Sequence, residues 1–181
     1  MGDSLTAAYG MATEQGWVAL LRRRLSEIGS EHHVINSSIS GETSSGGLRR
    51  IDVLLREYQP DVLILELGAN DGLRATMPDL IEHNLGKMIE KTKEQNVRVL
   101  LVGVRLPPNY GKPYIDAFHS IFIRLSNRHK VPLVPFLLQN IAEHDHLMQR
   151  DRFHPTAIAQ PIILETVWPF LFNILSTIRA D

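Results

Sequence analysis

The sequence predicts an α/β fold in which helices cover both faces of a parallel sheet. Segments with apolar residues at helical spacing alternate with short, continuously apolar segments along the whole chain. This alternation is typical of βαβ units with right-handed crossovers. A length of 181 residues is enough for one domain with a substantial core. We therefore expect residues 1–181 to form a single domain.

Five segments have the periodicity of amphipathic helices. The first begins near Trp17 and ends at Gly29, and the second ends before Pro60. Pro161 and Pro169 are expected to bend the last one, because proline interrupts the hydrogen bonds of a helix. The five predicted helices cover residues 16–29, 48–58, 78–95, 113–130 and 156–179.

Three apolar runs, at residues 61–68, 97–104 and 131–136, are typical of strands buried on both faces of a sheet. A shorter apolar stretch, Val34–Ile35, precedes small polar residues that indicate a loop. In open parallel sheets, ligands bind beyond the carboxyl ends of the strands. Functional residues are therefore expected in the loops 2–4, 37–47, 68–74, 105–111 and 137–155.

Composition excludes several functions. The formal net charge is −1, so nothing suggests a nucleic-acid partner or a polybasic membrane anchor. Cysteine is absent, which excludes disulfides, a cysteine nucleophile and thiolate metal sites. We expect that no apolar stretch approaches the ~20 residues needed to span a bilayer. We also recognise no signal peptide. We expect no nucleic-acid partner and no stable membrane insertion.

The predicted loops contain the groups that nucleophilic acyl transfer requires. Ser4 supplies a hydroxyl, Gly41 an accessible backbone N–H, and Asn70 a neutral amide donor. Asp151 and His154 lie three residues apart, so a carboxylate can sit beside an imidazole. A nucleophile, a base, a group that orients the base and donors for an oxyanion form a complete set.

Each of these residues has a more ordinary interpretation when it is taken alone. Ser4 would be a turn or cap residue, Asn70 part of a turn, and Asp151 with His154 a local hydrogen-bonded pair. Their occurrence together at successive strand ends favours catalysis. His144 and His146 suggest a metal site only weakly, since their spacing suits no helix face. Phosphate-loop, dinucleotide-binding and G-x-S-x-G motifs are absent.

Four motifs in order resemble those of the GDSL/SGNH hydrolase family. They are Gly2-Asp3-Ser4-Leu5, Gly41, Gly68-Ala69-Asn70-Asp71 and Asp151-Arg152-Phe153-His154-Pro155. The segments "NSSISGETS", "ELGANDGLR" and "RLPPNYG" are similar to bacterial thioesterase I and lysophospholipase-type arylesterases. The resemblance extends from residue 2 to about the start of the last helix. It implies a flavodoxin-like three-layer α/β/α sandwich.

The resemblance also implies a role for each matching residue. Ser4 is the nucleophile, His154 the general base and then acid, and Asp151 the residue that orients His154. The backbone N–H groups of Ser4 and Gly41 and the Asn70 amide form the oxyanion hole. The family hydrolyses esters and thioesters, including acyl-CoA thioesters, lysophospholipids and aryl esters, through an acyl-serine intermediate. No metal or cofactor is expected, and the full-length protein is expected to be a monomer. The resemblance implies a periplasmic or secreted location, and a cytoplasmic one stays open because no signal peptide is recognised.

The substrate is less constrained by the sequence. Apolar residues in or near the expected mouth are candidates for an acyl-chain groove, or they pack beneath the loops. Two other functions remain open: a carbohydrate O-acetyl esterase, and a catalytically silent flavodoxin-like binding module. The candidate substrate-binding residues are Leu73, Met77, Leu106, Pro107, Tyr110 and Phe153.

The first strand of the predicted sheet is almost absent from the sequence. In the family, an apolar strand runs directly into the Gly-Asp-Ser-Leu turn and lies at the centre of a 2-1-3-4-5 sheet. Only Met1 remains of it here. We hypothesise that Met1 is an internal methionine and that a strand, and with it a secretion signal, lies upstream. Without that strand, we expect low stability, aggregation or strand borrowing from a partner, and weak activity.

Overall fold

A three-stranded parallel sheet lies at the centre of the computed structural model, which describes residues 1–178. The strands are β1 (Val62–Leu65), β2 (Arg98–Val102) and β3 (Leu133–Val134), in the order β1-β2-β3. Leu63 pairs with Val99, and Leu101 pairs with Leu133. Each strand lies within one of the three predicted apolar runs. The predicted parallel sheet is therefore confirmed.

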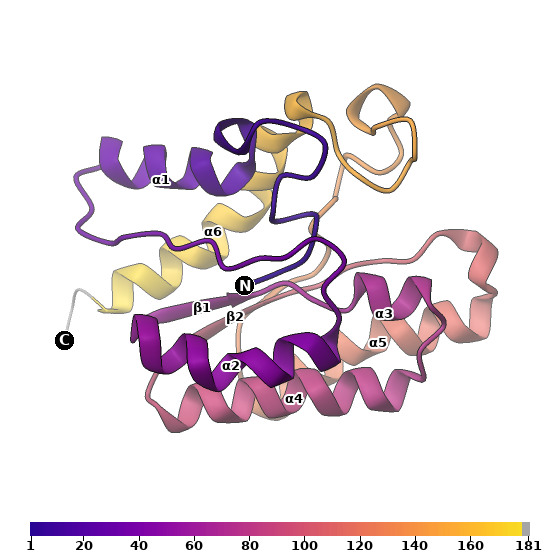
Figure 1. Ribbon diagram of the computed structural model, residues 1–181, viewed down its shortest axis with the longest axis horizontal. Helices are drawn as coiled ribbons and strands as arrows, with labels where there is room; N and C mark the ends of the chain where they lie inside the picture. Colours follow the sequence, from indigo (N-terminus) through magenta and orange to yellow (C-terminus); the bar gives the residue numbers. More distant parts are fainter. Residues whose placement is uncertain (179–181) are drawn as a thin grey trace.

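Long helices cover both faces of this sheet, as Figure 1 shows. On one face lie α1 (Trp17–Glu27) and α6 (Gln160–Ile178), which pack against each other. On the other face, α4 (Pro78–Glu94) lies between α2 (Ser44–Tyr58) and α5 (Lys112–His129). The three-layer α/β/α arrangement is confirmed. The short helices are η1 (Thr13–Gln15), α3 (Ala69–Leu73), η2 (Pro108–Tyr110), η3 (Asp145–Leu147) and η4 (Ala157–Ala159).

The core explains why the strands are continuously apolar. Leu100, Leu101 and Val102 of β2 have no exposed surface, because helices cover both sides of the central strand. From α5, Phe118 and Phe122 pack edge to face, with their ring centroids 5.7 Å apart. Burial of these side chains fixes the sheet against the helices.

Two parts of the predicted loops are helical. α2 begins at Ser44, inside the predicted loop 37–47, because the Thr43 side chain accepts a hydrogen bond from the Gly46 N–H at 3.1 Å and caps the helix. Residues 69–73 form the short helix α3 in place of a loop. In both places the strand-end residues are held by regular backbone hydrogen bonds.

The short apolar stretch Val34–Ile35 lies in a segment without regular secondary structure. One further prediction is corrected. Pro161 lies in the first turn of α6, where its missing N–H leaves no bond unmade, so it does not bend the helix. Pro169 lies inside α6. Residue 179, the predicted end of this helix, lies outside the described residues.

The last helical segment corrects the prediction that no apolar stretch approaches the length needed to span a bilayer. Ala157–Ile178 is 22 residues long and has a mean hydropathy of 1.4, so it is long and apolar enough to cross a membrane. Length and composition alone are weak evidence, because core helices of soluble proteins pass the same test. Here one face of α6 packs into the core through Ile163, Val167 and Leu171.

The first two residues pair with the end of β1. Gly2 forms a parallel bridge with Glu66. The Met1 ammonium donates to the Ile64 carbonyl at 3.0 Å, and the Glu66 N–H donates to the Met1 carbonyl at 3.0 Å. On the other side, the Ile39 N–H donates to the Gly2 carbonyl at 3.1 Å. This short ladder leads directly to Ser4.

Candidate active site

Ser4 lies in a tight turn immediately after this short ladder. The Asp3 carbonyl accepts the Ala7 N–H at 2.9 Å, and the Asp3 carboxylate accepts the Leu5 N–H at 3.0 Å. The turn packs closely on the end of β1. A Cβ at Gly2 would lie 2.6 Å from a carboxylate oxygen of Glu66 and 2.9 Å from its carbonyl oxygen, so only glycine fits there.

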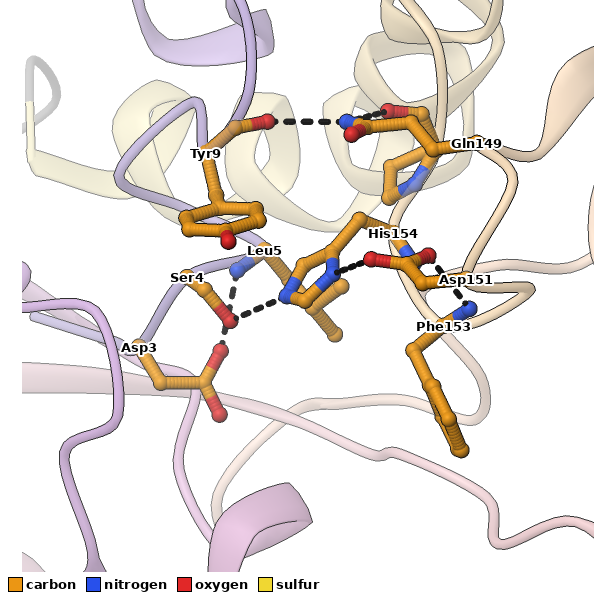
Figure 2. A network of polar contacts seen from close by, with 9 residues as sticks. Asp3, Ser4, Leu5, Tyr9, Gln149, Asp151, Phe153 and His154 are labelled. Atoms are coloured by element: carbon orange, nitrogen blue, oxygen red, sulfur yellow. Dashed lines mark hydrogen bonds and ion pairs between the residues drawn. The ribbon is translucent and has the colours of Figure 1, made fainter.

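Ser4, His154 and Asp151 form one hydrogen-bonded series, drawn in Figure 2. His154 Nε2 lies 2.8 Å from Ser4 Oγ, and His154 Nδ1 lies 2.7 Å from an Asp151 carboxylate oxygen. The other Asp151 oxygen accepts the backbone N–H groups of Phe153, at 3.0 Å, and His154, at 3.1 Å. The structure thus brings together residues that are 150 positions apart in the chain.

The surroundings of Asp151 favour its charged form. Partial burial opposes ionisation, but hydrogen bonds from the His154 ring and from two backbone N–H groups outweigh it and lower the pKa of Asp151. A charged Asp151 accepts a hydrogen bond from the Nδ1–H group, which leaves Nε2 as an acceptor facing the Ser4 hydroxyl. This is the tautomer that a general base requires.

Two residues that the sequence did not single out hold the Ser4 and His154 segments together. The Tyr9 and His154 rings lie 4.4 Å apart between centroids. The Gln149 side-chain amide donates to the Tyr9 carbonyl at 2.8 Å and to the Pro155 carbonyl at 3.0 Å. Their sequence positions gave no signal, since the contacts join opposite ends of the chain.

Beneath Ser4 lies a buried pair of carboxyl groups, Asp3 and Glu66. A Glu66 oxygen accepts the Thr6 hydroxyl at 2.8 Å and the Asp3 N–H at 3.2 Å. Burial raises the pKa of Asp3 to about 6. Burial, with the nearby Asp3 carboxylate, also raises the pKa of Glu66 well above its ordinary value. A charged residue at the end of the apolar run "DVLILELG" was the sequence signal for Glu66.

Asn70 connects the turn that contains Ser4 with the loop that contains Gly41. Its side-chain amide donates to the Asp3 carboxylate at 3.1 Å and to the Glu42 carbonyl at 3.0 Å. Gly41, adjacent to Glu42, has φ +80°, and its α-carbon faces open space. The amide is therefore fixed between the Ser4 turn and the Gly41 loop. A developing oxyanion would have to share one of these two amide hydrogens.

The candidate substrate-binding residues separate into two groups. Met77 and Phe153 are exposed, at 71% and 44%. Leu106 is buried in the core, where it contacts the backbone at Gly72 closely. The Tyr110 hydroxyl donates to the Leu73 carbonyl at 2.9 Å, so it ties two loops together. Leu73 and Pro107 are half-buried.

Across residues 1–178, no group of three or more His, Cys, Asp or Glu side chains is placed to hold a metal ion. The His144 and His146 rings lie 5.7 Å apart between centroids, beside η3.

A hydroxyl, an imidazole and a carboxylate in one hydrogen-bonded series, at the carboxyl end of a parallel sheet, are typical of serine hydrolases. The model of the GDSL-like lipase/acylhydrolase family matches residues 1–160, and the chain belongs to this family.

Named relatives agree with this membership. Esterase TesA of Pseudomonas aeruginosa is 46% identical over 97% of this chain and 87% of that protein. Thioesterase 1/protease 1/lysophospholipase L1 of Escherichia coli K12 is 41% identical over 91% of this chain and 78% of that protein. The structure of the psychrotrophic esterase EstA from Pseudoalteromonas sp., inhibited by monoethylphosphonate, aligns with a TM-score of 0.93. Its sequence is 40% identical, and the alignment covers 97% of this chain and 96% of that one.

Proposed function

We propose that this protein hydrolyses carboxylic esters and thioesters by transferring the acyl group to Ser4 and then to water. The observation that carries the proposal is the hydrogen-bonded series from Ser4 through His154 to Asp151, with distances of 2.8 and 2.7 Å. The series is complete without any movement of the chain. The names of its relatives, esterase and thioesterase, support the same chemistry.

The first half of the reaction forms an acyl-enzyme. Ser4 Oγ attacks the carbonyl carbon of the substrate while its proton passes to His154 Nε2. Asp151 stabilises the imidazolium that results. The backbone N–H groups of Ser4 and Gly41 and the Asn70 amide donate to the oxyanion. The intermediate collapses when His154 gives its proton to the departing alcohol or thiol.

The second half returns the enzyme to its starting state. A water molecule attacks the acyl-serine carbonyl, and His154 Nε2 takes a proton from that water. The same donors stabilise the second oxyanion. Collapse releases the carboxylic acid and returns the proton from His154 to Ser4 Oγ.

The preferred substrates are acyl-CoA thioesters, lysophospholipids and aryl esters. Phe153, which is exposed and directly precedes His154, supports this choice, since an apolar side chain beside the reacting groups favours an acyl chain over an acetyl group. Leu73, Met77, Leu106, Pro107 and Tyr110 are the other proposed residues of an acyl-chain groove. A chain-length series of p-nitrophenyl esters separates this proposal from a carbohydrate O-acetyl esterase, which would prefer acetate. The proposed location, periplasmic or secreted, and the monomeric state rest on the family resemblance.

Ser4→Ala tests the nucleophile. We expect loss of p-nitrophenyl ester hydrolysis and of covalent labelling by a fluorophosphonate, because the alanine has no hydroxyl to acylate. Ser120→Ala on α5 is the matched control and should keep both, because its hydroxyl donates to the Ala117 carbonyl and accepts from Arg124. Labelling of the Ser4→Ala protein would exclude Ser4 as the nucleophile. A wild-type protein that hydrolyses no ester would favour the binding module.

A further inference from the structure

The groups of the proposed reaction lie on two segments, and each segment is held by its own backbone hydrogen bonds. One segment is the histidine loop, residues 148–155. Met148 and Pro155 form an antiparallel bridge that closes this loop at its base. Inside the loop, the Gln149 N–H donates to the His154 carbonyl at 2.7 Å. The imidazole and its carboxylate partner therefore belong to one closed unit.

The other segment is the Ser4 turn, residues 3–10. The Tyr9 N–H donates to the Ser4 carbonyl at 3.2 Å, which fixes the Tyr9 backbone relative to Ser4. Gly10 follows with φ +74°, a conformation that glycine adopts without strain. Figure 2 shows the Tyr9 carbonyl directed towards Gln149 of the histidine loop.

The side chain of Gln149 connects the two segments. Its amide nitrogen donates to the Tyr9 carbonyl at 2.8 Å and to the Pro155 carbonyl at 3.0 Å. A primary amide has two N–H hydrogens, so both are used, one on each segment. A series of hydrogen bonds thus runs from the Ser4 backbone through Tyr9 and Gln149 to the histidine loop, and it does not pass through the Ser4 hydroxyl.

Gly10 provides the space that this amide occupies. A Cβ at Gly10 would lie 2.4 Å from Gln149 Oε1 and 3.0 Å from Gln149 Nε2. A separation of 2.4 Å is far shorter than the van der Waals contact of such atoms. A side chain at position 10 would therefore displace the amide from the Tyr9 and Pro155 carbonyls.

The proposed reaction removes the hydrogen bond between Ser4 and His154 halfway through its course. In the acyl-enzyme, Ser4 Oγ is an ester oxygen without a hydrogen. His154 has by then given its Nε2 proton to the leaving group, and its remaining proton is on Nδ1, facing Asp151. Two lone pairs then face each other where the free enzyme has a hydrogen bond of 2.8 Å, so this contact no longer holds His154 near Ser4.

We propose that Gln149 is a positioning residue that keeps His154 in place in the acyl-enzyme, a role that depends on the proposed reaction at Ser4. The two hydrogen bonds of the Gln149 amide do not involve Ser4 Oγ, so acylation leaves them intact. His154 Nε2 then stays where it can take a proton from the water that attacks the acyl carbon. A displacement of about 1 Å at such a point can lower a rate by about 10²-fold.

Gln149→Met tests this role, because methionine has a similar length and no N–H to donate. We expect kcat for p-nitrophenyl butanoate to fall by about 10- to 100-fold, since kcat includes deacylation. The ratio kcat/KM, which reports acylation, should fall by about threefold at most, because the Ser4 hydroxyl still bonds His154 in the free enzyme. The acyl-enzyme should accumulate, giving a burst of about one p-nitrophenol per chain and an acylated mass.

Gln139→Met is the matched control. Gln139 is exposed, and its amide donates to the neighbouring Asn140 side chain at 3.4 Å, outside both segments. This variant should leave kcat and kcat/KM unchanged. Complete labelling of wild type and both variants by a fluorophosphonate, at one group per chain, shows that their active sites are equally folded.

Gly10→Ala displaces the amide without changing Gln149. We expect the same pattern, with kcat falling more than kcat/KM. In a Gln149→Ala protein, whose side chain no longer reaches Gly10, the added Gly10→Ala change should lower kcat by about twofold at most. Additive losses would contradict the proposal, because they would mean that Gly10→Ala does not act by displacing the amide.

Two other results would overturn this role of Gln149 and leave the hydrolase function intact. One is an unchanged kcat in Gln149→Met, and the other is an equal fall in kcat and kcat/KM without a burst. A wild-type protein that neither hydrolyses p-nitrophenyl esters nor is labelled at Ser4 would instead exclude the proposed function, and with it this role of Gln149.

Discussion

Two carboxylate environments lie on either side of Ser4 and differ in what controls their charge. Asp151, towards solvent, accepts hydrogen bonds from an imidazole and two backbone N–H groups, and its pKa is lowered despite partial burial. Asp3 and Glu66, beneath Ser4, have raised pKa values because burial outweighs the hydrogen bonds they receive. The same functional group thus loses its proton more readily than usual on one side of Ser4 and less readily than usual on the other.

This difference separates reaction chemistry from support. In the proposed mechanism a charged Asp151 stabilises an imidazolium, which requires a full negative charge near the ring. Asp3 instead accepts the Leu5 N–H on one carboxylate oxygen and the Asn70 amide on the other, so an asparagine in its place would keep one of these two acceptors. Substitutions that remove charge but keep shape should therefore affect the two sites very differently.

Asp151→Asn should produce the largest effect within this comparison. We expect kcat to fall by about 10⁴-fold, because an amide donates to the imidazole and favours the wrong tautomer. Asp3→Asn keeps an acceptor for only one of its two partners, so it should weaken the support of the Ser4 turn and lower kcat by about tenfold. Steady-state hydrolysis of one p-nitrophenyl ester by both variants makes the measurement. Equal losses would remove the distinction between the two sites.

Asn70→Ala should produce the next largest effect. Asn70 contacts Asp3, but its proposed role is to donate a hydrogen bond to the oxyanion. Loss of one such donor lowers kcat by about 10²–10³-fold. Asn84→Ala is the matched control, because the Asn84 amide donates to Ser44 at 3.0 Å and to Ser45 at 2.9 Å, outside the triad. It should lower Tm and leave kcat nearly unchanged. A correctly folded Asn70→Ala protein with full activity would exclude Asn70 from the oxyanion hole.

The smallest effect concerns stability and pH. Asp3 titrates near 6 when folded, above its ordinary value of 3.8, so the folded state binds its proton more tightly than the unfolded state. The stability from this group is complete below about pH 4 and is lost as the pH rises through about 6. Relative to Asp3→Asn, the free energy of unfolding of the wild type should fall by about 3 kcal/mol across this range. Urea unfolding at several pH values measures it, and a constant difference would contradict the raised pKa.

Local patterns in the sequence were enough to predict most of the fold. The apolar runs predicted all three strands, because a strand buried on both faces has no polar side. The segment around Val34 was different, since its apolar stretch is only two residues long and the segment has no regular secondary structure. The helix at Ser44 was hidden among small polar residues, where one cap at Thr43 decided the backbone.

The sequence alone determined which residues were available for chemistry and in which loops they lie. Ser4, Asp151 and His154 were identified from residue type, spacing and family resemblance. The tertiary structure decided the rest: that Ser4 Oγ and His154 Nε2 lie 2.8 Å apart, that Tyr9 and Gln149 join the two segments, and that Glu66 is buried beneath Ser4. These facts depend on contacts between distant parts of the chain. Burial raises the pKa of a carboxyl group only after such contacts exclude water.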